Sequence, residues 1–258
     1  MAAFRPVIYI ENGSVRKTDV SFAWAPGFTG SQRRVNVKRL HDTFLARRPD
    51  SNVLEISSVS GVSLGRSLSA TALPLATGAT VEGVFQGSKV FAAPGGEIVG
   101  PFPELFGSRG TRIKGALRDL LSQAAAKSGA AVGELQLSHF EHGGRMFGLS
   151  PEGAFYNWVY VQALADPVNA ARARALKGFD AFTDIFFNPR VGYQSQAVAA
   201  ALYLVFEARH GPRLPKLAKD FEWFLGAVHG EPGLLAFDSI HAGASPAAAP
   251  KAAQGSLF

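Results

Sequence analysis

A carboxylate, an amide and an amine lie at helical intervals within one apolar stretch of the sequence. If residues 81–91 form a helix, Glu82, Gln86 and Lys89 share one face, because they are separated by four and then three positions. A lysine in apolar surroundings can lose its proton and attack an electrophilic carbon while a neighbouring carboxylate moves protons. The same spacing also suits a surface helix with a solvated polar stripe, so the neighbouring segments must decide between the two.

More polar groups lie in an unusually aromatic segment. Residues 178–189 place Asp180, Asp184 and Asn188 among four phenylalanines. Polar groups in such company are costly to bury unless they form hydrogen bonds or serve a function. We therefore expect these three side chains to be bonded within the protein or to a ligand.

A third candidate is a cluster of basic residues after a long loop. Residues 92–111 are rich in glycine and proline, and such loops in compact domains often carry function. Arg109 and Arg112 flank the start of a helix expected to run to about residue 126. A helix N-terminus and its arginines can hold phosphate oxygens, although a solvated helix start would look the same.

The N-terminal region is expected to form a strand, a hairpin and a helix. Residues 6–11 are β-branched and end at Asn12-Gly13, which indicates a tight turn into a second strand within residues 15–24. Residues 31–48 have helical periodicity, with His41 beside the apolar stripe in a structural role. The exposed side of that helix carries four basic residues, Arg33, Arg34, Lys38 and Arg39.

The remaining chain alternates strands and helices. We expect a strand at residues 52–58 and a hairpin at residues 134–149. Helices are expected to begin at Ser150, at Asp166 and near residue 194. One last amphipathic helix is expected to cover residues 214–228. Trp158 lies in an aromatic-rich helix, as core or as a pocket wall. The fold class predicted is α+β, mainly helical, with a small sheet and hairpins.

Length and composition bound the class of protein. A chain of 258 residues with 47% hydrophobic residues can bury one sizeable core. It has no cysteine, which excludes disulfides and thiolate metal sites and suits a cytosolic protein. Residues 1–20 resemble neither a signal peptide nor a membrane span. We expect a soluble, cytoplasmic protein with a disordered Ala/Pro-rich tail from residue 242.

The positive charge is concentrated near the N-terminus. The net charge is +6, and residues 1–50 hold nine Lys/Arg against four Asp/Glu, which leaves +5 there. This region could attract phosphate-rich partners, or the charge could serve solubility alone.

Several common chemistries have no motif here. The chain has no Gly-Lys pair and hence no P-loop, no G-x-G-x-x-G and no H-E-x-x-H. Nucleoside triphosphate hydrolysis, classical dinucleotide oxidoreduction and zincin proteolysis are therefore not expected, and we expect no α/β-hydrolase chemistry either.

These segments together resemble the NADAR (NAD- and ADP-ribose-associated) family. Leu68-Ser69-Ala70 followed by Val81-Glu82-x-x-Phe85-Gln86-x-x-Lys89-x-Phe91 is similar to the family's Leu-Ser-Asn-Phe and Glu-to-Lys signature. Trp158 and the segment from Asp180 to Gln196 resemble later parts of the family pattern. The chain departs from it at Ala70-Thr71 and Gly83-Val84. Residues 1–51 and the 134–149 hairpin look like additions found in a branch paired with DNA-modifying ADP-ribosyltransferase toxins.

The resemblance implies a domain organisation. Residues 52–241 would form the NADAR-like catalytic domain, residues 1–51 an extension packed on it, and residues 242–258 the tail.

The resemblance also implies hydrolysis of an N-glycosidic bond, without a metal or redox cofactor. The substrate would be ADP-ribose on guanine bases of nucleic acid, or an aminopyrimidine ribose phosphate of the riboflavin pathway. Lys89 would form a Schiff base with the opened ribose, Glu82 would transfer protons, and Asp180 or Asp184 would assist or bind hydroxyls. The substrate-binding set implied is Ser69, Gln86, Arg109, Arg112, Trp158, Asp180 and Asn188, with Trp158 stacking on the base.

The partners implied are ADP-ribosylated DNA or free ADP-ribose, and a cognate ADP-ribosyltransferase toxin. The basic residues Arg33 to Arg39 favour DNA over a small metabolite, because a nucleic acid has phosphates for them to meet. Two other classes stay open, namely a silent ADP-ribose or nucleotide-binding module and a DNA-binding or toxin-neutralising interaction protein.

Overall fold

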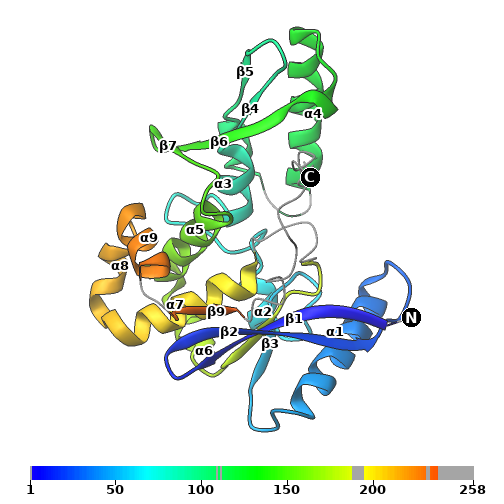
Figure 1. Ribbon diagram of the computed structural model, residues 1–258, viewed down its shortest axis with the longest axis vertical. Coiled ribbons are helices and arrows are strands. Elements are labelled where there is room, and N and C mark those ends of the chain that lie inside the picture. The colour runs from blue at the N-terminus through cyan, green and yellow to red at the C-terminus, as the bar shows by residue number, and fades with distance from the viewer. Residues whose placement is uncertain (1, 109, 111, 188–194, 231–232, 238–258) are drawn as a thin grey trace, which may run out of the picture.

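The computed structural model describes residues 2–108, 110, 112–187, 195–230 and 233–237, and these form a single α+β domain as expected (Figure 1). A broad body carries a five-stranded sheet, and a narrower arm built from a second sheet and a long helix projects from it. Helices α3 (Val81–Gly87) and α5 (Ala154–Ala165) lie where the arm joins the body.

The sheet of the body has the order β3-β8-β1-β2-β9. Its strands are β1 (Ala2–Glu11), β2 (Ser14–Ala23), β3 (Val53–Glu55), β8 (Ala181–Thr183) and β9 (Leu235–Phe237). The predicted hairpin is confirmed, since β1 and β2 pair antiparallel around Asn12 and Gly13, both with positive φ. β1 also pairs with β8, so residues 1–51, expected to form an added extension, supply the middle of the sheet.

Helix α1 (Gly30–Leu45) covers one face of this sheet. It begins at a capping box, in which Thr29 accepts from the Gln32 amide and the Gln32 side chain accepts from the Thr29 amide. Leu40 and Phe44 are buried against the sheet, as the periodicity predicted. Successive β1 residues face opposite sides, so Val7 packs toward α1 while Ile8 joins the main core beyond the sheet.

The main core is built around α5 and α7 (Gln196–His210). Both helices are almost entirely buried, in keeping with their apolar sequences. The other helices of the body are α2 (Ser63–Ser67), α6 (Ala170–Leu176), α8 (Leu214–Leu217) and α9 (Phe221–His229), with 3-10 turns η3 (Pro167–Asn169) and η4 (Gly211–Arg213).

The arm packs a four-stranded sheet against α4 (Arg112–Ser128). The sheet order is β5-β4-β6-β7, with β4 (Lys89–Ala92), β5 (Ile98–Val99), β6 (Gln136–His142) and β7 (Arg145–Phe147). The expected hairpin at 134–149 and the expected helix from about 112 are both confirmed. Phe91, Leu117 and Leu121 form its own small core. The 3-10 turns η1 (Pro103–Leu105) and η2 (Val132–Glu134) complete the arm.

Three predicted boundaries were wrong. The helix starting at residue 81 ends at Gly87, and Lys89 begins strand β4. Helix α5 begins at Ala154, and its N-cap is Gly153 with a φ of 79°, so Ser150 is not the N-cap that the sequence predicted. The last helix divides into α8 and α9, because the Asp220 side chain accepts from the Glu222 and Trp223 amides and starts a new helix. The predicted tail from residue 242 lies outside the described residues.

Two glycines explain why α3 fits so closely beneath the arm. A Cβ on Gly83 would lie 2.9 Å from the Leu105 carbonyl oxygen, and one on Gly87 would lie 2.7 Å from the Phe102 carbonyl oxygen. The Phe102 amide also donates to the Gly87 oxygen at 2.6 Å. The absent side chains thus let backbone meet backbone where the arm joins the body.

Replacing Gly87 by alanine should lower the free energy of unfolding by about 1–3 kcal/mol, because backbone must move to admit the methyl group. Urea denaturation measures this loss. Gly115→Ala in α4 is the matched control, since its Cβ meets nothing within 4 Å and alanine favours a helix by about 1 kcal/mol over glycine. Equal stability of the two variants would contradict the close packing of α3.

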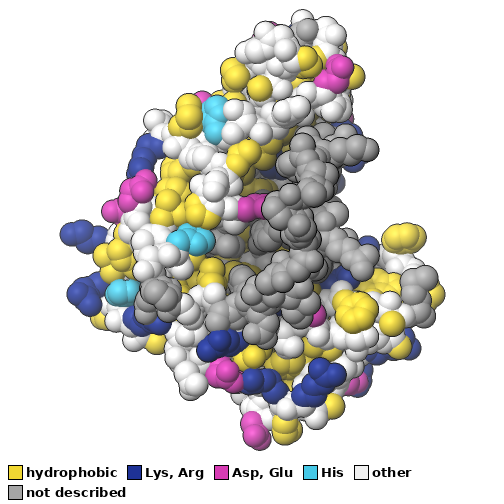
Figure 2. Space-filling view, viewed as in Figure 1, with side chains coloured by type: hydrophobic (Ala, Val, Ile, Leu, Met, Phe, Trp, Pro, Cys, Tyr) yellow, Lys and Arg dark blue, Asp and Glu magenta, His cyan; other side chains and the backbone are white. Residues whose placement is uncertain are grey.

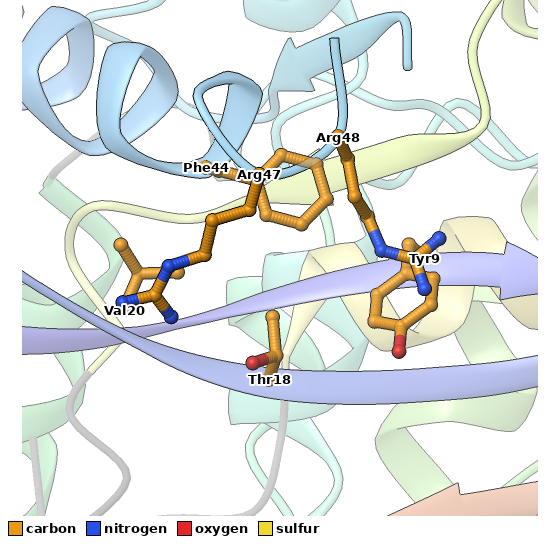
Figure 3. A pocket seen from close by; sticks show the side chains of 6 residues that line it. All are labelled: Tyr9, Thr18, Val20, Phe44, Arg47 and Arg48. Atoms are coloured by element: carbon orange, nitrogen blue, oxygen red, sulfur yellow. The ribbon is translucent and has the colours of Figure 1, made fainter. Parts of the chain in front are cut away.

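Two hollows lie away from the sequence-predicted site residues. A cavity of about 80 Å³ lies where the C-terminal end of α1 meets β1 and β2. It is lined by Tyr9, Thr18, Val20, Phe44, Arg47 and Arg48 (Figure 3). Within it the Arg48 guanidinium is 4.1 Å from the Tyr9 ring centre and pairs with Glu11 at 2.7 Å. An open groove of about 430 Å³ lies between α6, α7 and α8.

No helix in the described part of the chain is long and apolar enough to cross a lipid bilayer.

Candidate active site

The loop at residues 68–70 and the start of α3 are joined by backbone hydrogen bonds. The Thr80 side chain caps the helix by accepting from the Gly83 amide at 3.1 Å. The Glu82 amide then donates to the Ala70 carbonyl oxygen at 2.9 Å. The loop with the expected Leu68-Ser69 signature therefore lies against the turn that carries Glu82.

Glu82 and Gln86 share a face of α3, as their spacing predicted. The Gln86 amide nitrogen donates to Glu82 Oε1 at 2.9 Å, and both side chains are more than nine-tenths buried. Gln86 Oε1 has no hydrogen-bond partner among the described residues. A buried acceptor without a partner is costly, and a ligand donor would satisfy it.

Lys89 reaches the same region from strand β4. Its side chain is buried, and its ammonium group lies 5.0 Å from the centre of the Phe85 ring. Burial lowers the pKa of Lys89 from 10.5 to about 8, the nearby Glu82 opposes this, and Lys114 adds to it. Within the described part of the chain, no hydrogen bond or ion pair engages the amine. A pKa of about 8 leaves a minor fraction of the amine neutral at pH 7, and the neutral form of an amine is the nucleophile.

Asp184 follows β8 and is tied to α7 and to the 68–70 loop. Gln196 donates from its side chain to Asp184 Oδ2 at 2.8 Å and accepts from the Ala70 amide at 2.5 Å. Burial raises the pKa of Asp184 to about 7, and the charge of Glu55 contributes. One glutamine thus fixes Asp184 relative to the loop that also holds Glu82.

Tyr156 of α5 lies within electrostatic reach of both Glu82 and Asp184. Its ring meets the Phe85 ring edge-on, with centres 5.1 Å apart. Burial raises the pKa of Tyr156 well above 10, and the charges of Glu82 and Asp184 both add to that rise. Its hydroxyl is therefore protonated and close enough to both acids to feel their charges. The structure so gathers Glu82, Lys89 and Asp184 around α3 and α5.

The other sequence-predicted residues divide into several groups. Ser69 is buried next to the site but donates locally, to the Arg66 carbonyl oxygen at 2.8 Å. Arg112 is exposed at the start of α4, two residues before Lys114, whose charge reaches Lys89. Arg109 and Asn188 lie outside the described residues.

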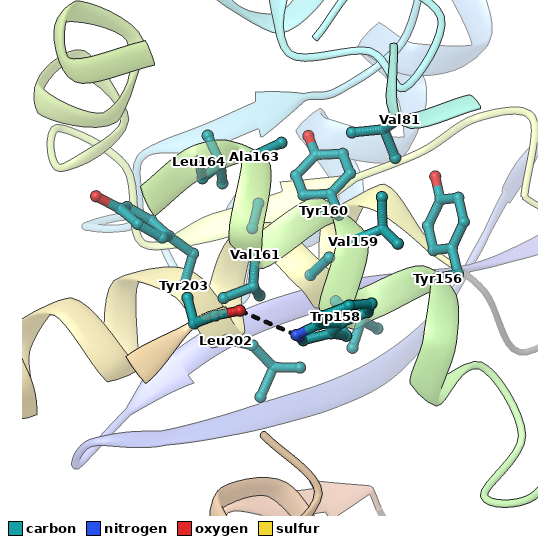
Figure 4. Packing of buried hydrophobic residues seen from close by; sticks show 14 of the residues in the cluster. Val81, Tyr156, Trp158, Val159, Tyr160, Val161, Ala163, Leu164, Leu202 and Tyr203 are labelled. Atoms are coloured by element: carbon teal, nitrogen blue, oxygen red, sulfur yellow. Dashed lines mark hydrogen bonds between the residues drawn. The ribbon is translucent and has the colours of Figure 1, made fainter. Parts of the chain in front are cut away.

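Asp180 and Trp158 have structural partners away from this cluster. Asp180 is exposed at the start of β8, opposite to the Asp184 end, and accepts from the Asn52 amide at 2.7 Å. Trp158 is 5% exposed, and its indole N–H donates to the Ala218 carbonyl oxygen at 2.9 Å (Figure 4). Of the two readings of Trp158, core or pocket wall, the packing supports the core.

The basic residues of α1 lie beside the segment that carries Asp184. The Arg33 guanidinium is 4.5 Å from the centre of the Phe186 ring, which is 45% exposed. Arg34 is exposed, whereas Lys38 pairs with Asp42 at 2.6 Å and Arg39 donates to the Ala23 carbonyl oxygen. Figure 2 shows Lys and Arg side chains spread over the lower part of the molecule, where Figure 1 places the β1–β2 hairpin and α1.

The spacing Gly-x-Ser-x-Gly, which we did not expect, does occur at residues 61–65. Ser63 is exposed at the start of the five-residue α2. It forms no hydrogen bond to a histidine within the described part of the chain, so this stretch has no base to activate a nucleophile.

Sequence analysis missed three residues that shape the site, namely Glu55, Tyr156 and Gln196. The Glu55 signal was available, since a charged residue interrupts the apolar strand Val53-Leu54-Glu55-Ile56 and is 2% exposed. Tyr156 and Gln196 had no comparable local signal, because their roles depend on contacts with residues far along the chain.

Comparison with known proteins gives one family match. The model of the DarT1-associated NADAR antitoxins matches residues 3–232, which is nearly the whole chain and includes the N-terminal strands. No curated protein matches the chain. The match extends across the loop, helix and strands that bring Glu82, Lys89 and Asp184 together. The chain belongs to the family of DarT1-associated NADAR antitoxins.

Proposed function

We propose that this antitoxin is an N-glycosyl hydrolase that removes ADP-ribose from guanine bases of nucleic acid. The observation that carries the proposal is the buried amine of Lys89, which lies near Glu82 and has no bonded partner among the residues that the structure describes. Burying a lysine is costly, and a reactive amine is a common reason for that cost.

The Lys89 nitrogen would attack the anomeric carbon of the ribose that is attached to the base. The carbon–nitrogen bond to the base breaks, and its electron pair leaves with the base, which takes up a proton. Glu82 accepts the proton that the lysine nitrogen loses. The ring oxygen then departs with a proton as the nitrogen lone pair forms an imine, and water later releases the sugar and restores the amine.

Asp184 is the acid best suited to protonate the departing base. Its raised pKa of about 7 leaves a proton on it at neutral pH. The fraction of Lys89 that is neutral increases as pH rises through about 8. The fraction of Asp184 that is protonated decreases as pH rises through about 7. Activity should therefore follow a bell-shaped pH profile with its maximum between these values.

The rest of the substrate would be held by groups around this centre. Gln86 Oε1 offers a free acceptor to a ribose hydroxyl, and Ser69 lies in the adjoining loop. Arg112, with Arg109 before it, would meet the phosphates at the start of α4. Asn188 is kept as a substrate-binding candidate from sequence alone. The cognate toxin and a cytoplasmic location remain expectations of the same kind.

The test is incubation of the protein with guanine-ADP-ribosylated DNA while loss of the modification is followed. Wild type should remove ADP-ribose, and Lys89→Ala and Glu82→Ala should not. Borohydride should trap a Lys89 adduct, because it reduces the imine to a stable amine. An inactive wild type would contradict the proposed activity and would leave hydrolysis of an aminopyrimidine ribose phosphate or a binding module as the function. Full activity in both variants would contradict the roles assigned to Lys89 and Glu82.

The basic residues of α1 would hold the nucleic acid beside the site. Arg33→Ala should raise the KM for modified DNA by about 3–10-fold at low salt and reduce the salt dependence of binding by about one ion. The kcat should stay constant, since Arg33 is outside the reacting centre. Arg174→Ala on α6 is the matched control, because that arginine is exposed beside the remote groove. An equal change in both variants would contradict a role for α1.

A further inference from the structure

The buried carboxylate of Glu55 bonds the two residues that flank Asp184. Glu55 ends strand β3 and is 2% exposed, and β3 pairs in parallel with β8 so that Glu55 lies opposite Thr183. The Thr183 hydroxyl donates to Glu55 Oε2 at 2.5 Å, and the Ile185 amide donates to Glu55 Oε1 at 2.9 Å. The two donors are the residues on either side of Asp184. The carboxylate thus holds both neighbours of Asp184, Thr183 through its hydroxyl and Ile185 through its backbone amide.

The hydrogen bonds behind Glu55 have a defined direction. Because the Thr183 hydroxyl gives its proton to Glu55, its oxygen must accept from His41 Nε2, which is 2.8 Å away. His41 therefore carries its proton on Nε2. Burial lowers the pKa of His41 to about 4, so it stays neutral at physiological pH. A fixed chain of hydrogen bonds thus runs from α1 through Thr183 to Glu55.

Charged and titratable groups face Asp184 from several elements. Glu55 of β3 is near enough to raise its pKa, although burial is the larger cause. Arg5 of β1 interacts electrostatically with Asp184, and so do Tyr156 and Tyr160 of α5. On α7 the neutral Gln196 donates to it. Among these groups Glu55 penalises a charge on Asp184 and also bonds both of its neighbours in the chain, Thr183 and Ile185.

We propose that Glu55 is a positioning residue that sets both the place of Asp184 and its protonation in the site. The inference rests on the proposed glycohydrolase function, in which Asp184 gives a proton to the departing base. Burial raises the pKa of Glu55 itself, while its hydrogen bonds with Ile185, Thr183 and Ser57 favour its charged form. In that form Glu55 repels a second negative charge in the same buried region, so it favours a neutral Asp184. The two hydrogen bonds keep Glu55 itself in a fixed position while it does so.

The Glu55→Gln variant separates charge from shape. Glutamine has the same size, can accept from the Ile185 amide, and can donate to Thr183 if that hydroxyl turns toward His41. Loss of the negative charge should lower the pKa of Asp184 by about one unit. Because the reactive form needs protonated Asp184 and neutral Lys89, the acid limb of the pH profile, which lies near pH 7, should move to about pH 6, while the alkaline limb stays near pH 8. Activity at pH 8 should then fall about 10-fold, while activity near pH 6 changes by less.

Thr183→Val is the matched comparison, because it removes the hydroxyl that links His41 and Glu55 but keeps the charge of Glu55. It should lower kcat by a similar factor at every pH, with no downward shift of the limb. A merely structural role for Glu55 predicts this same pattern for Glu55→Gln. An unshifted acid limb in Glu55→Gln would therefore overturn the proposal.

A carbon-detected NMR titration of the Asp184 carboxyl tests the inference without any turnover. Wild type should show a pKa near 7, and Glu55→Gln should show a lower one. If wild type releases no ADP-ribose but the titration behaves as expected, the proposed function fails and the pairing of Glu55 with Asp184 stands. If Glu55→Gln does not fold, the wild-type titration alone decides, since an ordinary pKa near 4 for Asp184 overturns the proposal.

Discussion

Replacing Lys89 by methionine should abolish release of ADP-ribose and at the same time make the fold more stable. The loss of activity should be at least ~10³-fold, because the proposed reaction needs the Lys89 amine to form the bond to the sugar. Methionine has a similar length and no charge, so it can fill the same buried space beside Phe85. The two effects have one cause, which is the desolvated amine.

The gain in stability follows from the pKa of Lys89 and depends on pH. Its pKa is about 8 in the folded protein against an ordinary 10.5, so the fold disfavours the charged form by up to ~3 kcal/mol. That penalty is complete below pH 8, decreases as pH rises from about 8 to 10.5, and is absent above 10.5. Lys89→Met should therefore exceed wild type most at pH 7 and least near pH 10.5.

Urea denaturation of both proteins at pH 7 and pH 10 measures the effect. Lys127→Met on α4 is the control, since that lysine is exposed and its loss should leave both activity and stability nearly unchanged. A Lys89→Met protein that keeps its activity would remove Lys89 from the mechanism. One that is no more stable than wild type at pH 7 would show that the amine is solvated.

Local patterns in the sequence were enough for most elements of the fold. The β1–β2 hairpin followed from β-branched residues around Asn12-Gly13, and the inner face of α1 followed from Val37, Leu40 and Phe44. The position of the hairpin inside the sheet was not predictable in this way. It depends on pairing of Ile8 with Phe182, which lies far along the chain and leaves no local signal.

The candidate site was predictable where its residues are close in sequence. Glu82 and Gln86 bond each other because four positions make one helical turn. Lys89 was expected near Glu82, and it lies there, but on strand β4 and not on the helix that the spacing predicted. Strand β4 forms by pairing with Phe140 and its neighbours on β6. Helical spacing and a turn into a strand both bring residue 89 near residue 82, and only the long-range pairing distinguishes them.

Glu55 and Gln196 show what a local pattern cannot supply. Each acts by bonding a segment more than a hundred residues away along the chain, Glu55 to Thr183 and Ile185, and Gln196 to Ala70. A buried charge in a strand indicates that some partner exists. Which partner it is, and that it flanks a reacting residue, depends on how β3 and β8 pair.

The second large effect is expected at Trp158, where the family resemblance and the structure favour different roles. Trp158→Ala should lower the free energy of unfolding by about 3–5 kcal/mol. Its ring packs against Phe147 and Phe221, with centres 5.3 Å away in each case, and its N–H satisfies the Ala218 carbonyl oxygen. Removing it would leave a cavity in the core and an unpaired buried acceptor.

Trp158→Phe is the variant that decides between core and base stacking. If Trp158 serves packing, this variant should lose part of its stability in urea, while the KM for modified DNA of the folded protein stays unchanged. Phe28→Ala is the control for removal of an aromatic ring, because Phe28 is 91% exposed and its loss should alter stability by no more than about 0.5 kcal/mol. A Trp158→Phe protein with wild-type stability and a much higher KM would instead restore the base-stacking role that the family resemblance implied.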